Sequence, residues 1–196
     1  MRNCSKIGII GDSGSGKSTL IDLIIGLLKP SKGKILIDNL NYEILNKKKL
    51  FYNFRYASQK VFIFDTSLRQ NICLKDDNEK IDEENFKKAI EISELEDFIE
   101  SKKDREFYDL GEFGKNISGG QRQKVGIARA IYSNRPIIIF DESTNALDEL
   151  NEKKIISNIM KLDKKTIIFI SHNHNNLLNF DEIYKIDNKT INKLSL

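Results

Sequence analysis

A glycine-rich run near the beginning of the chain has the residue types and the spacing needed to hold a chain of phosphates. Residues 11–18 read GDSGSGKS, which satisfies the pattern G-x-x-x-x-G-K-[ST]. At average residue frequencies, such a match arises by chance on the order of one time in a hundred in a chain of this length. The run therefore predicts a phosphate-binding loop.

The chemistry expected of this loop divides between its backbone and two side chains. Glycines let the backbone wrap around phosphates, and amides at the start of a following helix point at the phosphate oxygens. Lys17 would neutralise the β and γ oxygens, and Ser18 would coordinate Mg²⁺. The residues that we expect to contact the phosphates are Gly11, Gly14, Ser15, Gly16, Lys17, Ser18 and Thr19.

Two adjacent carboxylates follow a short apolar run at residues 137–140. Such an acidic pair, taken alone, is more often a plain helix N-terminus, because carboxylates interact favourably with the helix dipole there. Combined with the upstream loop, the pair predicts the second half of a nucleotide site. Asp141 would hold the Mg²⁺ shell, and Glu142 would polarise the water that attacks the γ-phosphate.

Four further motifs accompany the loop and the carboxylate pair. Gln59 is followed by KVFIFDTSLRQNI, the run ISGGQRQKVGIARA begins at Ile117, STNALD occupies residues 143–148, and TIIFISH ends on His172. In this order they resemble the Q-loop, signature, D-loop and H-loop of the ABC ATPases. The resemblance covers nearly the whole chain.

The resemblance assigns roles to these motifs. In that family two domains pair head to tail, and each signature covers the γ-phosphate of ATP bound to the partner's loop. Gln59 would then reach Mg²⁺ and the attacking water, and His172 would contact the γ-phosphate. Without the other motifs, His172 would be interpreted as a structural histidine at the end of a strand. For His174, two residues further on, we keep that structural interpretation. The signature residues implied to contact the partner's ATP are Ser118, Gly119, Gly120 and Gln121.

The resemblance also implies the cofactors, the site residues, the partners and the cellular location of the protein. The cofactors are ATP and Mg²⁺, with Ser18, Gln59 and Asp141 as metal ligands and Glu142, His172 and Gln59 as catalytic residues. The partners are a second ABC ATPase domain, in a homo- or heterodimer, and the transmembrane domains of a transporter at the cytoplasmic face of the membrane. Phe62 and Phe64 belong either to the groove that receives a transmembrane coupling helix or to the plain core.

Three features are similar to exporters rather than importers. They are the segment FDTSLRQNI, the stretch with Gly111 and Glu112 ahead of the signature, and the sequence DES at residues 141–143, where importers usually carry DEP. Two alternatives stay open. One is a soluble ABC ATPase that transports nothing, although the segment between Gln59 and the signature is too short for the coiled coil of repair proteins. The other is a catalytically poor module that dimerises on nucleotide.

The elements that must position these motifs follow an α/β pattern. Apolar β-branched runs at 6–10, 34–38, 54–58, 137–142 and 166–171 predict strands, of which the last two are typical of buried parallel strands. Helical periodicity at 19–28, 81–92, 121–132 and 149–162 predicts helices. We therefore expect one ABC ATPase domain over 1–196: a P-loop NTPase parallel-sheet core (1–64 and 135–196) with an inserted α-helical subdomain (65–134).

Composition narrows the function classes. A length of 196 residues suits one domain, and a net charge of +3 from 32 basic and 29 acidic residues is too balanced for a nucleic-acid-binding surface. No apolar run approaches the roughly 18 residues that cross a bilayer. Two cysteines are too few for a disulfide framework or a metal site.

The N-terminal side of the loop is short. Only ten residues precede Gly11, whereas the family places an adenine-stacking aromatic and a small β subdomain further upstream. Tyr42 and Tyr52 lie away from where the family places its base. We therefore expect ATP to bind weakly, with little preference over GTP. Asn145 also replaces the usual D-loop serine, and Asn173 stands where exporters commonly carry arginine.

Overall fold

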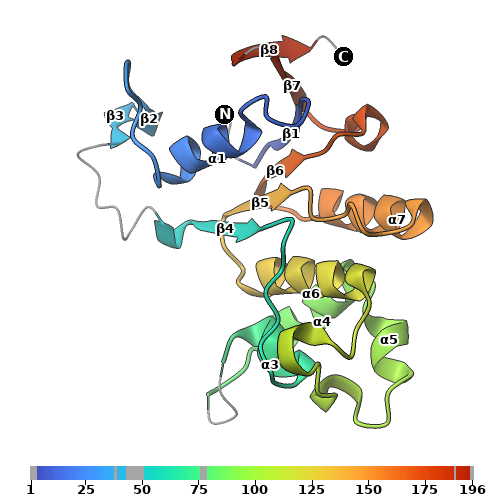
Figure 1. Ribbon diagram of the computed structural model, residues 1–196. Coiled ribbons are helices and arrows are strands. Elements are labelled where there is room, and N and C mark those ends of the chain that lie inside the picture. Colours follow the sequence, from blue (N-terminus) through green and yellow to red (C-terminus); the bar gives the residue numbers. More distant parts are fainter. Residues whose placement is uncertain (1–3, 38, 43–50, 76–78, 188, 195–196) are drawn as a thin grey trace.

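The centre of the computed structural model is one six-stranded sheet (Figure 1). The structure describes residues 4–37, 39–42, 51–75, 79–187 and 189–194. The strands lie in the order β4-β5-β6-β1-β7-β8, and neighbours are parallel except for the antiparallel pair β7 and β8. They are β1 (Lys6–Ile10), β4 (Phe54–Ala57), β5 (Ile137–Asp141), β6 (Thr166–Ile170), β7 (Glu182–Asp187) and β8 (Thr190–Leu194).

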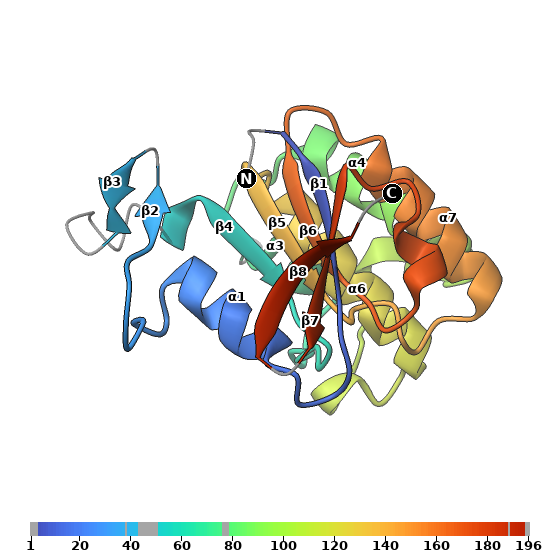
Figure 2. The ribbon, with the colours of Figure 1, turned by 90° about the horizontal axis from the view of Figure 1, so that it is seen from above.

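Helices cover both faces of this sheet (Figures 1 and 2). The helix α1 (Lys17–Ile25) lies on one face, and α6 (Gly119–Tyr132) and α7 (Glu149–Met160) lie on the other. Along β5 the side chains alternate, because Ile139 packs into the cluster that contains α1 whereas Phe140 packs into the cluster that contains α6 and α7. Strands buried on both faces are continuously apolar, so the predicted α/β class with a parallel core is confirmed.

The helix α1 ends earlier than its apolar periodicity predicts. It stops at Ile25 because Gly26 adopts a left-handed conformation with φ of 86°. The buried Tyr42 hydroxyl donates to the Gly26 carbonyl oxygen at 2.8 Å, which fixes this turn. Leu27 and Leu28, which the pattern placed inside the helix, are consequently 64% and 44% exposed.

The helices between β4 and β5 share one core with the sheet. They are α3 (Leu68–Cys73), α4 (Glu83–Ile92), α5 (Glu96–Glu100) and α6. A single cluster of buried side chains runs from α3 and α4 through α6 to β5 and β6. α6 therefore connects the helical region to the sheet, and the subdomain boundary predicted at residues 65 and 134 stays a prediction.

Two stretches near the ends of the sequence differ from the sequence prediction. The strand expected at 34–38 is only β2 (Leu36–Ile37), paired with β3 (Leu40–Asn41), and residue 38 lies outside the described residues. The hairpin of β7 and β8 was not predicted. In both strands apolar residues are interleaved with charged and polar ones. In the described part of the chain β8 lies at the edge of the sheet beside β7, and most of its residues are exposed.

Gly126, in the middle of α6, gives a stability prediction. A β-carbon there would lie 2.5 Å from Val61 Cγ2, so α6 contacts the segment after Gln59 without space for a methyl group. Alanine normally stabilises a helix interior by about 1 kcal/mol relative to glycine. We expect the opposite sign here, because the new methyl group would overpack the contact with Val61. Gly126→Ala should lower the free energy of unfolding, measured in urea, by about 1–3 kcal/mol.

A double-mutant cycle separates this contact from other effects. Val61→Ala removes the γ-carbons that the new methyl group would meet. The double variant should therefore lose less stability than the sum of the losses in the two single variants. A Gly126→Ala chain more stable than the unsubstituted chain would contradict the close packing.

Candidate nucleotide site

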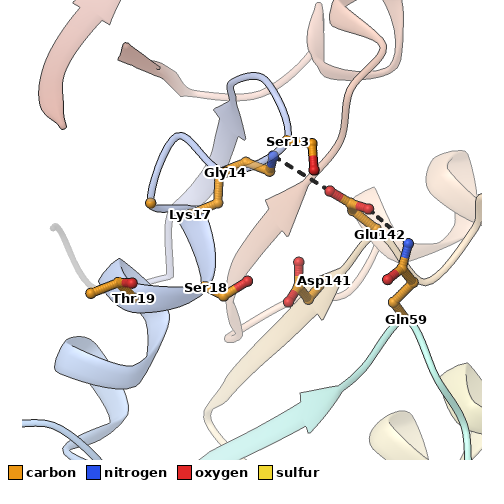
Figure 3. A pocket seen from close by; sticks show the side chains of 9 residues that line it. Ser13, Gly14, Lys17, Ser18, Thr19, Gln59, Asp141 and Glu142 are labelled. Carbon is orange, nitrogen blue, oxygen red and sulfur yellow. Dashed lines mark hydrogen bonds and ion pairs between the residues drawn. The ribbon is translucent and has the colours of Figure 1, made fainter. Parts of the chain in front are cut away.

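The predicted phosphate-binding loop and the carboxylate pair meet in one cavity (Figure 3). The loop connects β1 to α1, and the carboxylates stand at the carboxyl end of β5. In the sheet, β6 lies between β1 and β5. The cavity has a volume of about 310 Å³ and polar walls. Its lining residues are Ser13, Gly14, Gly16, Lys17, Ser18, Thr19, Gln59, Asp141 and Glu142.

Lys17 is anchored at the base of the loop. Its ammonium group donates to the carbonyl oxygens of Gly11 at 2.7 Å and Asp12 at 2.9 Å, and it lies 3.5 Å from Glu142 Oε1. The side chain is only 6% exposed. A nearly buried cation at a glycine-rich loop is suited to binding phosphate oxygens.

The Glu142 carboxylate is the centre of the site, with side chains contacting both of its oxygens. His172 Nε2 lies 2.5 Å from Oε1, the oxygen that also faces Lys17. Gln59 and Asn145 donate their amide hydrogens to Oε2 at 3.0 Å and 3.2 Å. The backbone of Glu142 is held in the left-handed region, with φ of 48°. Strained backbone of this kind persists where the surroundings fix it, commonly at active sites.

Asp141 has a different environment from its neighbour. It is 8% exposed, and its Oδ2 accepts a 2.5 Å hydrogen bond from the Tyr56 hydroxyl. Burial raises the pKa of the Asp141 carboxyl, and the bond from Tyr56 opposes that rise. Burial, followed by the bond to Asp141, raises the pKa of the Tyr56 hydroxyl above its ordinary value, at which it is already protonated at neutral pH.

The donor set at this point fits Mg²⁺. Ser18, Asp141 and Gln59 offer oxygen atoms and line the same cavity. In the described part of the chain, no group of three or more His, Cys, Asp or Glu side chains could hold a metal ion. Mg²⁺ does not require such a group, since it is usually bound through one or two carboxylates, substrate phosphates and water.

Some of the predicted site residues do not line this cavity, and some residues at the site were not predicted from the sequence. Gly11 and Ser15 are outside the lining set, although the Gly11 carbonyl oxygen holds Lys17. Sequence reasoning did not single out Ser13, Tyr56 or the contact of Asn145 with Glu142. The sequence feature that could have drawn attention to Tyr56 is a hydroxyl-bearing side chain near the end of the strand that leads to Gln59.

The signature residues form a second cavity that shares no described lining residue with the first. Ser118 caps α6, because its Oγ accepts from the Gln121 amide at 3.2 Å while Gln121 Oε1 accepts from the Ser118 amide at 2.9 Å. The Ser118 hydroxyl still has its own hydrogen to donate. This cavity is lined by Ser118, Gly119, Gly120, Gln121, Lys124, Ala146, Leu147, Asp148 and Asn151.

The D-loop lies between the two cavities. A β-carbon on Gly120 would lie 3.2 Å from the Ala146 carbonyl oxygen, and Gln123 Oε1 accepts from the Ala146 amide at 2.6 Å. One residue earlier, Asn145 contacts Glu142 in the first cavity. Residues 145–147 therefore contact both the signature helix and the predicted catalytic carboxylate.

Comparisons with known proteins agree with this arrangement. A family model described as ABC transporter matches residues 1–145. The transport/processing ATP-binding protein MesD for mesentericin Y105, from Leuconostoc mesenteroides, is 43% identical over 85% of this chain and 23% of the relative. The lactococcin-G-processing and transport ATP-binding protein LagD, from Lactococcus lactis subsp. lactis, is 39% identical over 93% of this chain and 26% of the relative.

A solved structure is also similar. A bacterial Atm1-family ABC exporter with ATP bound matches with a TM-score of 0.87 and 30% identity, over 95% of this chain and 33% of that one. The chain thus spans about a quarter of the length of the curated relatives it matches. Within the described residues, no helix has the length and apolar character of a membrane span.

Proposed function

The chain belongs to the ABC transporter family, as an ATP-binding and ATP-hydrolysing domain of the exporter type, and we propose that it powers export by pairing head to tail with a second such domain on ATP and Mg²⁺. The observation that carries this proposal is the position of Glu142. Its carboxylate stands inside the cavity of the phosphate-binding loop, with Lys17, Gln59 and His172 around it.

The proposed mechanism gives each of these side chains one task. Lys17 and the loop amides bind the β- and γ-phosphates. Glu142 accepts a proton from a water molecule that attacks the γ-phosphorus while the bond to the β-phosphate oxygen breaks, so that ADP and phosphate leave. Gln59 orients that water, and His172 donates to the γ-phosphate. Mg²⁺, held by Ser18, Asp141 and Gln59, would supply positive charge to the phosphate oxygens.

The separate second cavity supports the proposed pairing. The N-terminal amides of α6 and the Ser118 hydroxyl form an anion site that the chain's own loop does not share. In a head-to-tail pair, each of these sites would cover the γ-phosphate bound to the partner's loop. Two composite sites would then hold the pair together through the γ-phosphates.

An exposed aromatic patch, formed by Phe62, Phe64 and Phe113, supports docking onto transmembrane domains. The three side chains are 55%, 47% and 62% exposed, so Phe62 and Phe64 are not the plain core considered from the sequence. The Phe62 ring lies 5.0 Å from Phe64 and 6.0 Å from Phe113 between centroids. Clustered exposed aromatics mark interaction surfaces. We place this patch against the transporter's membrane part, at the cytoplasmic face.

Removal of the metal tests the proposed reaction. The chain is expected to release phosphate from ATP with Mg²⁺ present and to lose this activity when EDTA is added, because several kcal/mol of charge stabilisation disappear. Nucleotide binding should persist in EDTA, since Lys17 and the loop amides remain. The measurements are a phosphate-release assay and calorimetric titration with ATP.

A pair of lysine variants provides the control. Lys17→Ala should weaken ATP binding about 10- to 150-fold, as expected for losing charge-assisted hydrogen bonds of about 1.5–3 kcal/mol. Lys153→Ala, which removes an exposed lysine paired with Glu149, should bind ATP normally. Equal phosphate release with and without Mg²⁺, or normal ATP binding by Lys17→Ala, would contradict the proposed function.

A further inference from the structure

Tyr56 contacts the carboxylate that the proposed function assigns to Mg²⁺. It lies on β4, the edge strand that pairs with β5 in parallel, and its register partner on β5 is Ile139. Asp141 follows two residues later at the end of β5. The Tyr56 hydroxyl donates to Asp141 Oδ2 at 2.5 Å, across 85 residues of sequence. Strand pairing therefore sets the distance between the two side chains.

This hydrogen bond occupies one of the two Asp141 oxygens. A carboxylate with one oxygen held by a fixed donor loses rotation about its Cβ–Cγ bond, and the other oxygen is left to bind a cation. The nearby carboxylates of Glu142 and Asp22 repel Asp141, while Lys17 attracts it. Without the Tyr56 donor, these charges would act on a carboxylate that this hydrogen bond no longer holds.

We propose that Tyr56 is a positioning residue for Mg²⁺, which fixes the Asp141 carboxylate in the orientation that binds the metal. The inference rests on the proposed function, because it needs ATP and Mg²⁺ in the cavity. Tyr56 itself does not line that cavity, so we assign it a role that acts through Asp141. Partners behind a metal ligand orient that ligand, and their loss typically lowers metal affinity about 10- to 100-fold.

The test compares metal-dependent with metal-free binding. A non-hydrolysable ATP analogue is titrated calorimetrically into each chain, once in EDTA and once with saturating Mg²⁺, and the ratio of the two affinities gives the gain due to the metal. Tyr56→Phe removes only the hydroxyl oxygen. We expect this variant to keep the metal-free affinity and to lose about 10- to 100-fold of the gain.

Tyr52→Phe is the matched control, since it removes the hydroxyl of an exposed tyrosine whose ring stacks on Arg135. Its metal gain should equal that of the unsubstituted chain. Urea unfolding of both variants checks that the fold persists.

Each other outcome rejects a defined part of the account. A Tyr56→Phe chain with the full metal gain would overturn the inference and leave the proposed function standing. An equal loss in EDTA and in Mg²⁺ would mean that Tyr56 only supports the fold, and would also overturn the inference. An unsubstituted chain whose affinity does not respond to Mg²⁺ would overturn the inference, because there would be no metal gain for Tyr56 to support. The proposed function would be overturned only if phosphate release were also independent of Mg²⁺.

Discussion

Replacement of Glu142 by glutamine is expected to lower ATP turnover by at least about 100-fold, the factor that a general base typically contributes, while ATP still binds. Glutamine has the same shape but cannot accept the proton of the attacking water. Phosphate binding should not suffer, because Lys17 loses only a carboxylate neighbour at 3.5 Å and keeps its bonds to Gly11 and Asp12. Turnover is measured by phosphate release and binding by calorimetry.

The structure gives a reason to assign this role to Glu142 rather than to Asp141. Oδ2 of Asp141 is bonded to Tyr56, and its side chain is buried. Glu142 has no such bond to Tyr56 and projects into the cavity beside Gln59 (Figure 3), and His172 Nε2 lies 2.5 Å from its Oε1. Glu149→Gln, which alters an exposed glutamate on α7, serves as the matched control. Unchanged turnover in Glu142→Gln would remove Glu142 from the role of base.

The central strands and the main cavity could be predicted from the sequence because their signals are local. β1, β5 and β6 are mostly apolar runs rich in β-branched residues, which is typical of strands buried on both faces. The glycine-rich loop connects β1 directly to α1, and Asp141 and Glu142 stand where β5 ends. The loop and the two carboxylates therefore lie at the carboxyl ends of the parallel strands, where the loops that follow the strands meet.

The remaining contacts depend on pairings that the local sequence does not contain. Tyr56 reaches Asp141 only because β4 pairs with β5 in the observed register. The β7–β8 hairpin was missed because its edge strand is exposed and carries no apolar run. The end of α1 was placed too late because Gly26, fixed by Tyr42 from outside the helix, overrides the apolar pattern.

One short helix did carry a local signal that sequence reasoning overlooked. Ser67 and Gln70 form a capping box at the start of α3, with the Ser67 Oγ accepting from the Gln70 amide at 3.2 Å. The segment that contains them, FDTSLRQNI, was instead interpreted only by its resemblance to exporters. The capping pattern S-x-x-Q would have predicted the helix start directly.

Ser118→Arg is the second substitution with a large expected effect, because it should abolish pairing on ATP. The serine is both the cap of α6 and the hydroxyl that faces the second cavity. Arginine would fill the place of the partner's γ-phosphate with a long side chain. In light scattering, the Glu142→Gln chain with ATP and Mg²⁺ should double its mass from 22.6 kDa, and adding Ser118→Arg should return it to the monomer mass.

Two comparisons make this result specific. ADP lacks the γ-phosphate and should leave the Glu142→Gln chain monomeric. Ser133→Arg, at the far end of the same helix, changes a half-buried serine outside the second cavity and should leave the doubling intact. A dimer that persists without nucleotide would defeat the proposal that γ-phosphates hold the pair together.

The most direct test of the composite site is a mixture of two inactive chains. Lys17→Ala keeps an intact signature and Ser118→Arg keeps an intact phosphate-binding loop, so a head-to-tail pair of one of each contains one complete site. The measurement is phosphate release from ATP and Mg²⁺ by each variant alone and by their equimolar mixture. The account predicts hydrolysis by the mixture well above the sum of the separate rates. A mixture no more active than that sum, or full activity of Ser118→Arg alone, would contradict it.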